Sequence, residues 1–232
     1  MTYWDPIPTA RAMAGEPHPL WRGDRVSRDW SGPAPDGWEQ RDWRSVPGPF
    51  YAANTDTCLT GRQCAPEHVT YEDTCGSEFV YRRPRTPSEV HALICAAECE
   101  PFSGYGGDGD AHWTPELVRD WWRERARVRE WASGVGWGPW ATARSDWMND
   151  AAAGARAYVA HIDGDLADYL RGYMFRLAEG RSVQPGESLP EPVGPRSDVT
   201  RPGRSRTPLP SRAGSTCGTP RGCPSPPRPG SC

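Results

Sequence analysis

Proline and glycine decide where this chain can form regular structure. The sequence has 26 prolines and 25 glycines among its 232 residues, and both residue types interrupt helices and strands. Twelve of the prolines fall in residues 185–232, where apolar residues are sparse and no periodicity is visible. Such a segment cannot bury enough surface to offset the entropy lost on ordering. We therefore expect residues 183–232 to form a disordered Pro/Arg/Ser-rich tail.

Residues 1–45 form a second stretch rich in helix and strand breakers, but this one carries tryptophan. An indole ring can bury a large apolar area, which is unusual in a disordered segment. We therefore predict an irregular arm that packs its indole rings across a folded domain. The alternative is a disordered arm that results from a misassigned start codon. The five tryptophans concerned are Trp4, Trp21, Trp30, Trp38 and Trp43.

Between these ends, residues 46–182 carry the patterns of a single folded domain. Residues 67–72 and 78–82 alternate between polar and apolar positions, which is typical of strands. The turn-forming residues between them include Gly76, which can adopt a positive φ. The pattern predicts a short antiparallel β-hairpin.

Two helices are predicted from one start signal, a threonine followed by proline. In the first, Thr86 is the N-cap and Glu89 completes a capping box. The second begins after Thr114 in the same way. Apolar residues recur at helical spacing in both segments. The predicted apolar faces are Val90, Leu93, Ile94 and Ala97 in the first helix, and Leu117, Trp121, Val128 and Trp131 in the second.

A third helical segment runs from about Asp146 to Glu179, with Ser145 as N-cap and Gly180 after its end. Unbroken, it would span about 50 Å at 1.5 Å per residue. We expect a break at Asp163–Gly164, because an interior glycine costs about 1 kcal/mol relative to alanine. The predicted fold is α+β, with a short antiparallel β-hairpin and three or four helices.

The stretch from Val46 to Trp131 resembles a family of uncharacterised proteins from GC-rich actinobacteria. The resemblance implies no particular activity, cofactor or site. The similar segments are 54–57 (Asn-Thr-Asp-Thr), 60–62 (Thr-Gly-Arg), 83–87 (Arg-Pro-Arg-Thr-Pro) and 108–110 (Asp-Gly-Asp).

The composition also lacks lysine, because all 27 basic residues are arginine. This bias is typical of a GC-rich genome and says little about function. The net charge of −3 is unevenly distributed, with about +4 in residues 185–232 and about −7 in the rest. A basic tail favours weak contact with nucleic acid or an acidic partner. The alternative is a solvated or out-of-frame extension.

The sequence predicts a cytoplasmic protein. No stretch approaches the roughly 20 apolar residues that a membrane span requires. Residues 1–20 contain four prolines and lack the apolar segment of a signal peptide. In the cytoplasm, the eight cysteines are expected to be thiols or metal ligands rather than disulfides.

The cysteines form the sharpest candidate site. His91, Cys95 and Cys99 are spaced by four residues on the first predicted helix, but one metal ion cannot bind all three because eight residues rise about 12 Å. Cys95 and Cys99, completed by Cys58 and Cys64, would make a tetrathiolate site for zinc or an iron–sulfur cluster. Their spacing differs from that of zinc ribbons and ferredoxins. The alternative is that the thiols fill the core as small hydrophobic groups.

A second candidate is the glycine-rich loop over residues 104–112. Asp108, Asp110 and His112 offer two carboxylates and an imidazole just before a predicted helix. Hard cations or anionic ligands could bind such a loop. The alternative is an ordinary connector, because Gly/Asp loops between helices are common.

The remaining motifs favour no catalytic function. The chain has no G-x-S-x-G, Rossmann or Walker pattern, so the sequence gives no argument for an enzyme or a cofactor. Arginines 82, 83 and 85 cluster before the first helix, but a clean basic stripe for nucleic acid is missing. Twelve tryptophans exceed the need of a small core, and Trp and Arg are enriched at interface hot spots. We therefore expect a non-catalytic protein that acts by contact with another protein; the alternative is the metal-binding protein described above.

Overall fold

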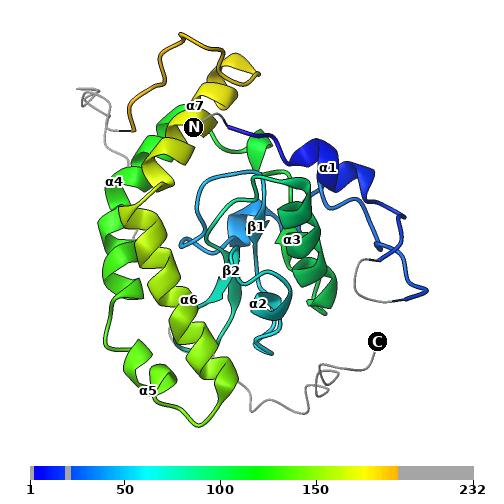
Figure 1. The fold of residues 1–232 in the computed structure, drawn as a ribbon, viewed down its shortest axis with the longest axis vertical. Coiled ribbons are helices and arrows are strands. Elements are labelled where there is room, and N and C mark those ends of the chain that lie inside the picture. The colour runs from blue at the N-terminus through cyan, green and yellow to red at the C-terminus, as the bar shows by residue number, and fades with distance from the viewer. Residues whose placement is uncertain (1–2, 19–21, 193–232) are drawn as a thin grey trace. The chain divides into compact units, whose positions relative to one another are not determined.

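Helices pack on both sides of a small central hairpin in this protein, whose computed structural model describes residues 3–18 and 22–192 (Figure 1). These residues belong to one unit that spans Met1–Gly194. The fold is α+β, as predicted. The described residues contain seven α-helices rather than three or four: α1 (Ile7–Ala12), α2 (Gly61–Cys64), α3 (Pro87–Cys99), α4 (Pro115–Ala132), α5 (Trp137–Ala141), α6 (Asp146–Asp163) and α7 (Leu166–Glu179).

The described strands form two antiparallel pairs. The predicted hairpin is confirmed, with β2 (Val69–Tyr71) paired to β3 (Glu78–Val80). The other pair, β1 (Tyr51–Ala52) and β4 (Tyr105–Gly106), was not predicted, and β4 lies in the segment 104–112 that was expected to be a loop. Short 3-10 helices add Trp38–Gln40 and Gly109–Ala111.

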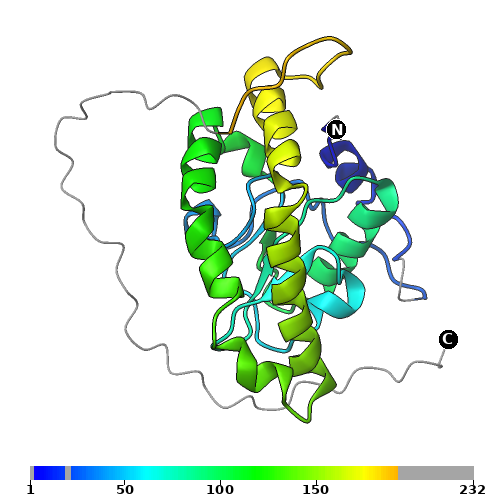
Figure 2. The ribbon, with the colours of Figure 1, turned by 60° about the vertical axis from the view of Figure 1, so that its left-hand side comes forward.

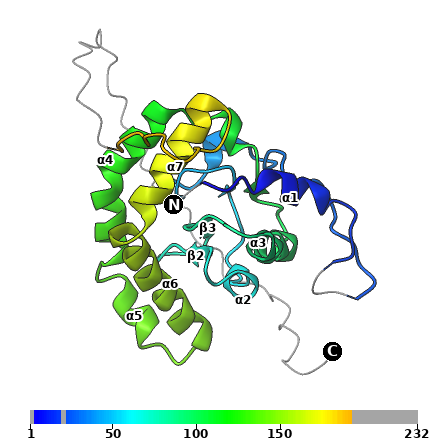
Figure 3. The ribbon, with the colours of Figure 1, turned by 45° about the horizontal axis from the view of Figure 1, so that its top comes forward.

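The hairpin is buried on both faces, which the alternating sequence did not indicate. All six residues of β2 and β3 are buried, including the polar Thr70 and Glu78. The reason is the surrounding helices: α6 and α2 both contact β2, and Figure 3 shows β2 and β3 between α6 and α3. The turn itself is held by Glu72, whose carboxylate accepts hydrogen bonds from the backbone N–H groups of Thr74 and Gly76 at 2.8 and 2.7 Å.

The threonine caps of α3 and α4 act as predicted, but the Glu89 carboxylate accepts the backbone N–H of Arg85 rather than that of Thr86, so the capping box is incomplete. Thr86 accepts a hydrogen bond from the N–H of Glu89, and Thr114 accepts one from Leu117, both at 3.3 Å. The predicted apolar face of α4 is partly wrong. The fully buried face contains Val118 and Trp122, one residue further along than Leu117 and Trp121, and Leu117 is exposed. Both pairs have the same i, i+4 spacing, so periodicity alone did not separate them.

The third helical segment breaks where the glycine predicted it. Helix α6 ends at Asp163 and α7 begins at Leu166, with Gly164 between them. Gly180 ends α7 with a φ of +68°. Figure 2 shows α6 and α7 in one column with α4 alongside, and α4 contacts both. One of the two main apolar clusters fills this side of the hairpin; among its residues are Phe79, Trp122, Tyr158, Leu170 and Tyr173.

The N-terminal segment packs against the rest of the unit and is not irregular throughout. It contains α1, which contacts α3, and buried Trp30, whose indole N–H donates to the Glu98 carboxylate at 2.6 Å. Tyr3 packs on Tyr169 and Tyr173 of α7. The predictions for Trp21 and for most of the tail, residues 193–232, lie outside the described residues.

No helix within the described ranges combines the length and the apolar character needed to cross a membrane.

Candidate functional site

Two cysteine thiols meet where the last residues of two helices come together. Cys64 ends α2 and Cys99 ends α3, and their Sγ atoms are 3.4 Å apart. Both residues are free thiols and partly exposed. Cys95 lies one turn earlier on α3 and is buried. The structure thus brings together two of the four cysteines predicted as metal ligands and places a third nearby.

The fourth predicted ligand has a different chemical state. Cys58 is disulfide-bonded, and so is Cys75. This corrects the expectation that the cysteines would be thiols or metal ligands rather than disulfides. A sulfur atom in a disulfide is not a thiolate, so Cys58 does not complete a tetrathiolate with Cys64, Cys95 and Cys99 in this state. Within residues 3–18 and 22–192, no three or more His, Cys, Asp or Glu side chains are arranged to hold a metal ion.

The two neighbouring thiols are chemically unequal. The hydrogen bond with Cys99 lowers the pKa of Cys64, and the same bond together with burial raises the pKa of Cys99. Burial raises the pKa of Cys95 to about 11. Because the thiolate is the reactive form of cysteine, the lowered pKa favours Cys64 over Cys99 as a nucleophile.

A buried carboxyl group accompanies the thiols. Glu78 of β3 is 2% exposed. Its carboxylate accepts a hydrogen bond from the N–H of Gly61 at 2.7 Å and from the hydroxyl of Tyr105 at 2.6 Å. Burial raises the pKa of Glu78 to about 7; the two hydrogen bonds oppose this rise, and the nearby Asp56 and Glu100 carboxyls add to it. Glu78 is therefore a group that titrates near neutral pH.

Glu100 closes the loop behind α3 and brings a second buried carboxylate to this region. It accepts hydrogen bonds from the N–H groups of Asp56 and Gly104, at 2.8 and 2.6 Å. Sequence reasoning missed both Glu78 and Glu100. Their sequence neighbourhoods gave no signal, since Glu78 occupied a polar position of an alternating strand and Glu100 followed a helix.

The predicted loop site is divided by the structure. His112 and Asp108 lie together, with Nε2 of the imidazole 3.0 Å from the carboxylate, and the hydroxyl of Tyr51 donates to Asp108 at 2.8 Å. Trp38 stacks on His112 with ring centroids 4.8 Å apart. Asp110 instead accepts a hydrogen bond from Tyr173 at 2.7 Å. Strand β4 and a 3-10 helix order this loop, and the three predicted residues do not converge on one point.

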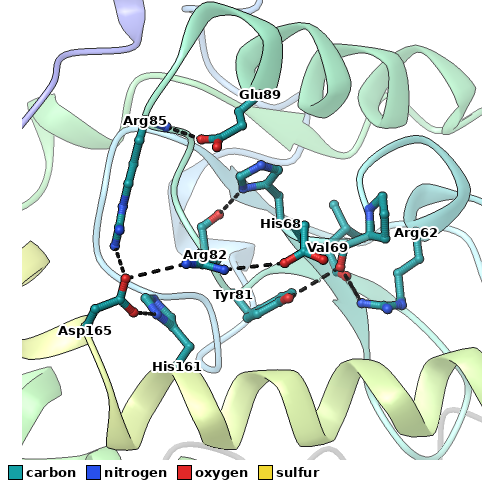
Figure 4. A network of polar contacts seen from close by, with 11 residues as sticks. Arg62, His68, Val69, Tyr81, Arg82, Arg85, Glu89, His161 and Asp165 are labelled. Atoms are coloured by element: carbon teal, nitrogen blue, oxygen red, sulfur yellow. Dashed lines mark hydrogen bonds and ion pairs between the residues drawn. The ribbon is translucent and has the colours of Figure 1, made fainter.

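A second polar network, drawn in Figure 4, links the start of α3 to the junction of α6 and α7. Buried His161 and half-buried Asp165 form its centre, with Nδ1 2.6 Å from the carboxylate. Arg85 reaches the same carboxylate at 2.6 Å and Arg82 at 3.5 Å. Burial lowers the pKa of His161 to about 4. Burial alone would raise the pKa of Asp165, but hydrogen bonds from His161 and Arg85 lower it to about 2. We interpret this network as structural, because its arginines are paired within it.

The network makes a pH prediction for His161. The histidine has a pKa of about 4 when folded and about 6.5 when unfolded. Below pH 6.5 the unfolded chain therefore binds a proton that the folded chain does not, and stability is lost as the pH falls towards 4. Between pH 7 and 4.5 this histidine should remove about 2 kcal/mol from the free energy of unfolding.

The measurement is urea unfolding at both pH values for the wild type and His161→Asn, whose side-chain amide can still donate to Asp165. The variant should lose about 2 kcal/mol less than the wild type on acidification. Exposed His91→Asn serves as the control and should behave as the wild type. Parallel curves for wild type and His161→Asn would contradict the assignment.

Comparison with known proteins finds no relative of this chain. No protein-family model matches the chain, and neither a curated protein nor a solved structure shows significant similarity to it. The resemblance to actinobacterial proteins therefore stays a prediction.

Proposed function

We propose that this protein acts in thiol–disulfide exchange, with Cys64 and Cys99 cycling between a dithiol and a disulfide. The observation that carries the proposal is the 3.4 Å separation of their Sγ atoms. A disulfide bond is about 2.05 Å long, so the two sulfur atoms need to approach by only about 1.4 Å. Partial exposure of both residues gives a reagent access to them.

The difference in pKa between the two thiols sets the order of the chemical steps. The Cys64 thiolate attacks one sulfur of a small disulfide of the glutathione class, which releases one thiolate and leaves a mixed disulfide on Cys64. Cys99 then loses its proton and attacks the Cys64 sulfur, which forms the internal disulfide and releases the second thiolate. In total, two protein thiols become one disulfide and the small disulfide becomes two thiols. The protein is oxidised and the reagent is reduced.

The earlier hypotheses have less support from the contacts. The surplus of tryptophan favoured a protein partner. Part of this surplus packs in the interior, because four tryptophans of the described residues are buried: Trp30, Trp113, Trp122 and Trp137. Contact with another protein, a cytoplasmic location and the zinc or iron–sulfur site remain predictions.

Peptide mapping tests the proposal. The full chain is reduced, exposed to glutathione disulfide, alkylated and digested, and cross-linked peptides are identified by mass spectrometry. We expect one product to join the peptides that carry Cys64 and Cys99, with the loss of two hydrogens. Cys64→Ser and Cys99→Ser should each abolish this product completely.

Cys95→Ser is the matched control, because it removes the neighbouring thiol from the same helix and should leave the cross-link in place. The proposal fails if oxidised wild-type protein still alkylates at both Cys64 and Cys99. It also fails if Cys95→Ser removes the cross-link as completely as Cys64→Ser does.

A further inference from the structure

Helix α2 connects the buried carboxyl group of Glu78 to the thiol of Cys64. The helix has four residues, begins at Gly61 and ends at Cys64. Its N-cap residue, Thr60, makes no side-chain capping bond. Glu78 supplies that contact instead, because its carboxylate accepts the Gly61 N–H at 2.7 Å. The position of Cys64 next to Cys99 therefore depends on where Glu78 holds the first residue of α2.

Glu78 approaches this helix closely at Gly61. A Cβ atom on residue 61 would overlap the Glu78 carboxylate. Residues three apart lie on neighbouring positions of a helix face, so Gly61 presents Cys64 on the side of the helix near Glu78. The Glu78 carboxyl group of β3 thus contacts the first residue of the short helix whose last residue is Cys64.

The groups that surround Glu78 come from every element packed against it. They are the Cys64 and Cys99 thiols of α2 and α3, the phenols of β2 and β4, and two further carboxyl groups beside β1 and α3. By residue they are Cys64, Cys99, Tyr71, Tyr105, Asp56 and Glu100. All of these groups are neutral or acidic. Arg62 of α2 is a cation in the same region, and its guanidinium is paired with Asp150 at 2.9 Å, whereas the charge of Glu78 acts on both thiols.

We infer that Glu78 is the positioning residue of the Cys64–Cys99 pair, fixing the start of α2 and slowing the attack of Cys64 once its own carboxyl group is ionised. This inference rests on the proposed exchange function. A carboxylate disfavours a nearby thiolate by Coulomb repulsion, and the charge of Glu78 raises the pKa of both Cys64 and Cys99. The carboxyl group has a pKa of about 7. Ionisation of Glu78 thus offsets part of the usual rise of thiolate with pH and slows the exchange above about pH 7 relative to a site without this charge.

The test measures the rate at which glutathione disulfide forms the Cys64–Cys99 cross-link at pH 6 and pH 8.5. Glu78→Gln keeps an oxygen acceptor for Gly61 and cannot ionise; its amide N–H group faces the Tyr105 hydroxyl, which then accepts instead of donating. We expect this variant to react about fivefold faster than the wild type at pH 8.5, the effect of about 1 kcal/mol of repulsion. At pH 6, where Glu78 is protonated in the wild type, the two rates should agree within about twofold.

Glu67→Gln is the matched control. It removes a carboxylate just before the same hairpin, from a side chain that is largely exposed and paired with Arg82, and it should follow the wild type at both pH values. The shape of the pH–rate profile is a second readout. The profile of the wild type should flatten near pH 7, and that of Glu78→Gln should not.

The outcomes separate this inference from the proposed function. Equal rates for wild type and Glu78→Gln at both pH values, with a normal cross-link, overturn the role of Glu78 and leave the exchange function standing. A cross-link that never forms in the wild type overturns the exchange function itself. A Glu78→Gln variant that is slower at pH 8.5 also contradicts the inference, because it shows that the charge accelerates the reaction.

Discussion

Replacing Arg83 with alanine should lower the free energy of unfolding by about 4 kcal/mol. The Arg83 side chain is 2% exposed. It donates hydrogen bonds to the backbone carbonyls of Phe50 and Pro47, and it lies among tyrosines that include Tyr158 and Tyr169. Alanine leaves these carbonyls without their donor and opens a cavity between the rings. Removal of a buried charge offsets part of this loss, since burial already lowers the pKa of Arg83.

Urea unfolding measures the effect, and the neighbouring arginine is the control. Arg82 has a side chain that is 33% exposed and forms ion pairs with Glu67 and Asp165. Pairs of this exposed kind contribute little, so Arg82→Ala should cost less than about 1 kcal/mol. Equal losses of unfolding free energy for the two adjacent arginines would show that the burial of Arg83 does not contribute to stability.

Replacing Phe79 with alanine should also cost about 4 kcal/mol. Phe79 is fully buried in β3, and its ring contacts Trp131 and Tyr158 with centroid distances of 5.6 and 6.0 Å. These neighbours belong to α4 and α6, so the ring joins the hairpin to the helical layer. A buried phenylalanine cut back to alanine loses its transfer free energy and leaves a void that packed helices refill poorly.

Thermal and urea unfolding of Phe79→Ala can be compared with Phe102→Ala. Phe102 is 66% exposed in the loop after α3, and its replacement should change stability by less than about 0.5 kcal/mol. A large loss for Phe102→Ala, or a negligible one for Phe79→Ala, would place the core elsewhere.

The parts of the fold that were predictable from the sequence are those determined by local chemistry. Thr86 and Thr114 cap the helices they were expected to cap, and Gly164 interrupts the long helical segment. Helices α1, α2 and α5 were not predicted. Each has six residues or fewer, too short for a periodic pattern, and such helices depend on tertiary packing for their stability.

The burial of charged residues could not be predicted from the sequence, for a different reason. Arg83 stood in a cluster with Arg82 and Arg85 and looked like part of a basic surface, yet it is enclosed by segments more than 30 residues away on either side. Glu78 was assigned to a half-exposed strand that helices cover on both faces. Tertiary contacts decide these positions, and no local pattern reports them.

The candidate site was predicted in fragments. The i, i+4 spacing correctly placed Cys95 and Cys99 on neighbouring turns of one helix, but the pair in contact is Cys99 with Cys64, 35 residues earlier. That pairing depends on α2, which the sequence did not show. In the glycine-rich loop, Asp108 and Asp110 were expected to act together. A 3-10 helix begins between them, and their carboxylates bind different tyrosines.

The contact between the N-terminal segment and α7 has a consequence for how the chain reaches its fold. Tyr3 packs on Tyr169 and Tyr173, its carbonyl accepts a hydrogen bond from Ser182, and Asp5 pairs with Arg176. During synthesis, Tyr3 and Asp5 cannot make these contacts until α7, made more than 160 residues later, has left the ribosome. Contacts between residues so far apart are slow to form. The N-terminal segment can therefore dock in two stages, with α1 and Trp30 on α3 before Tyr3 and Asp5 on α7.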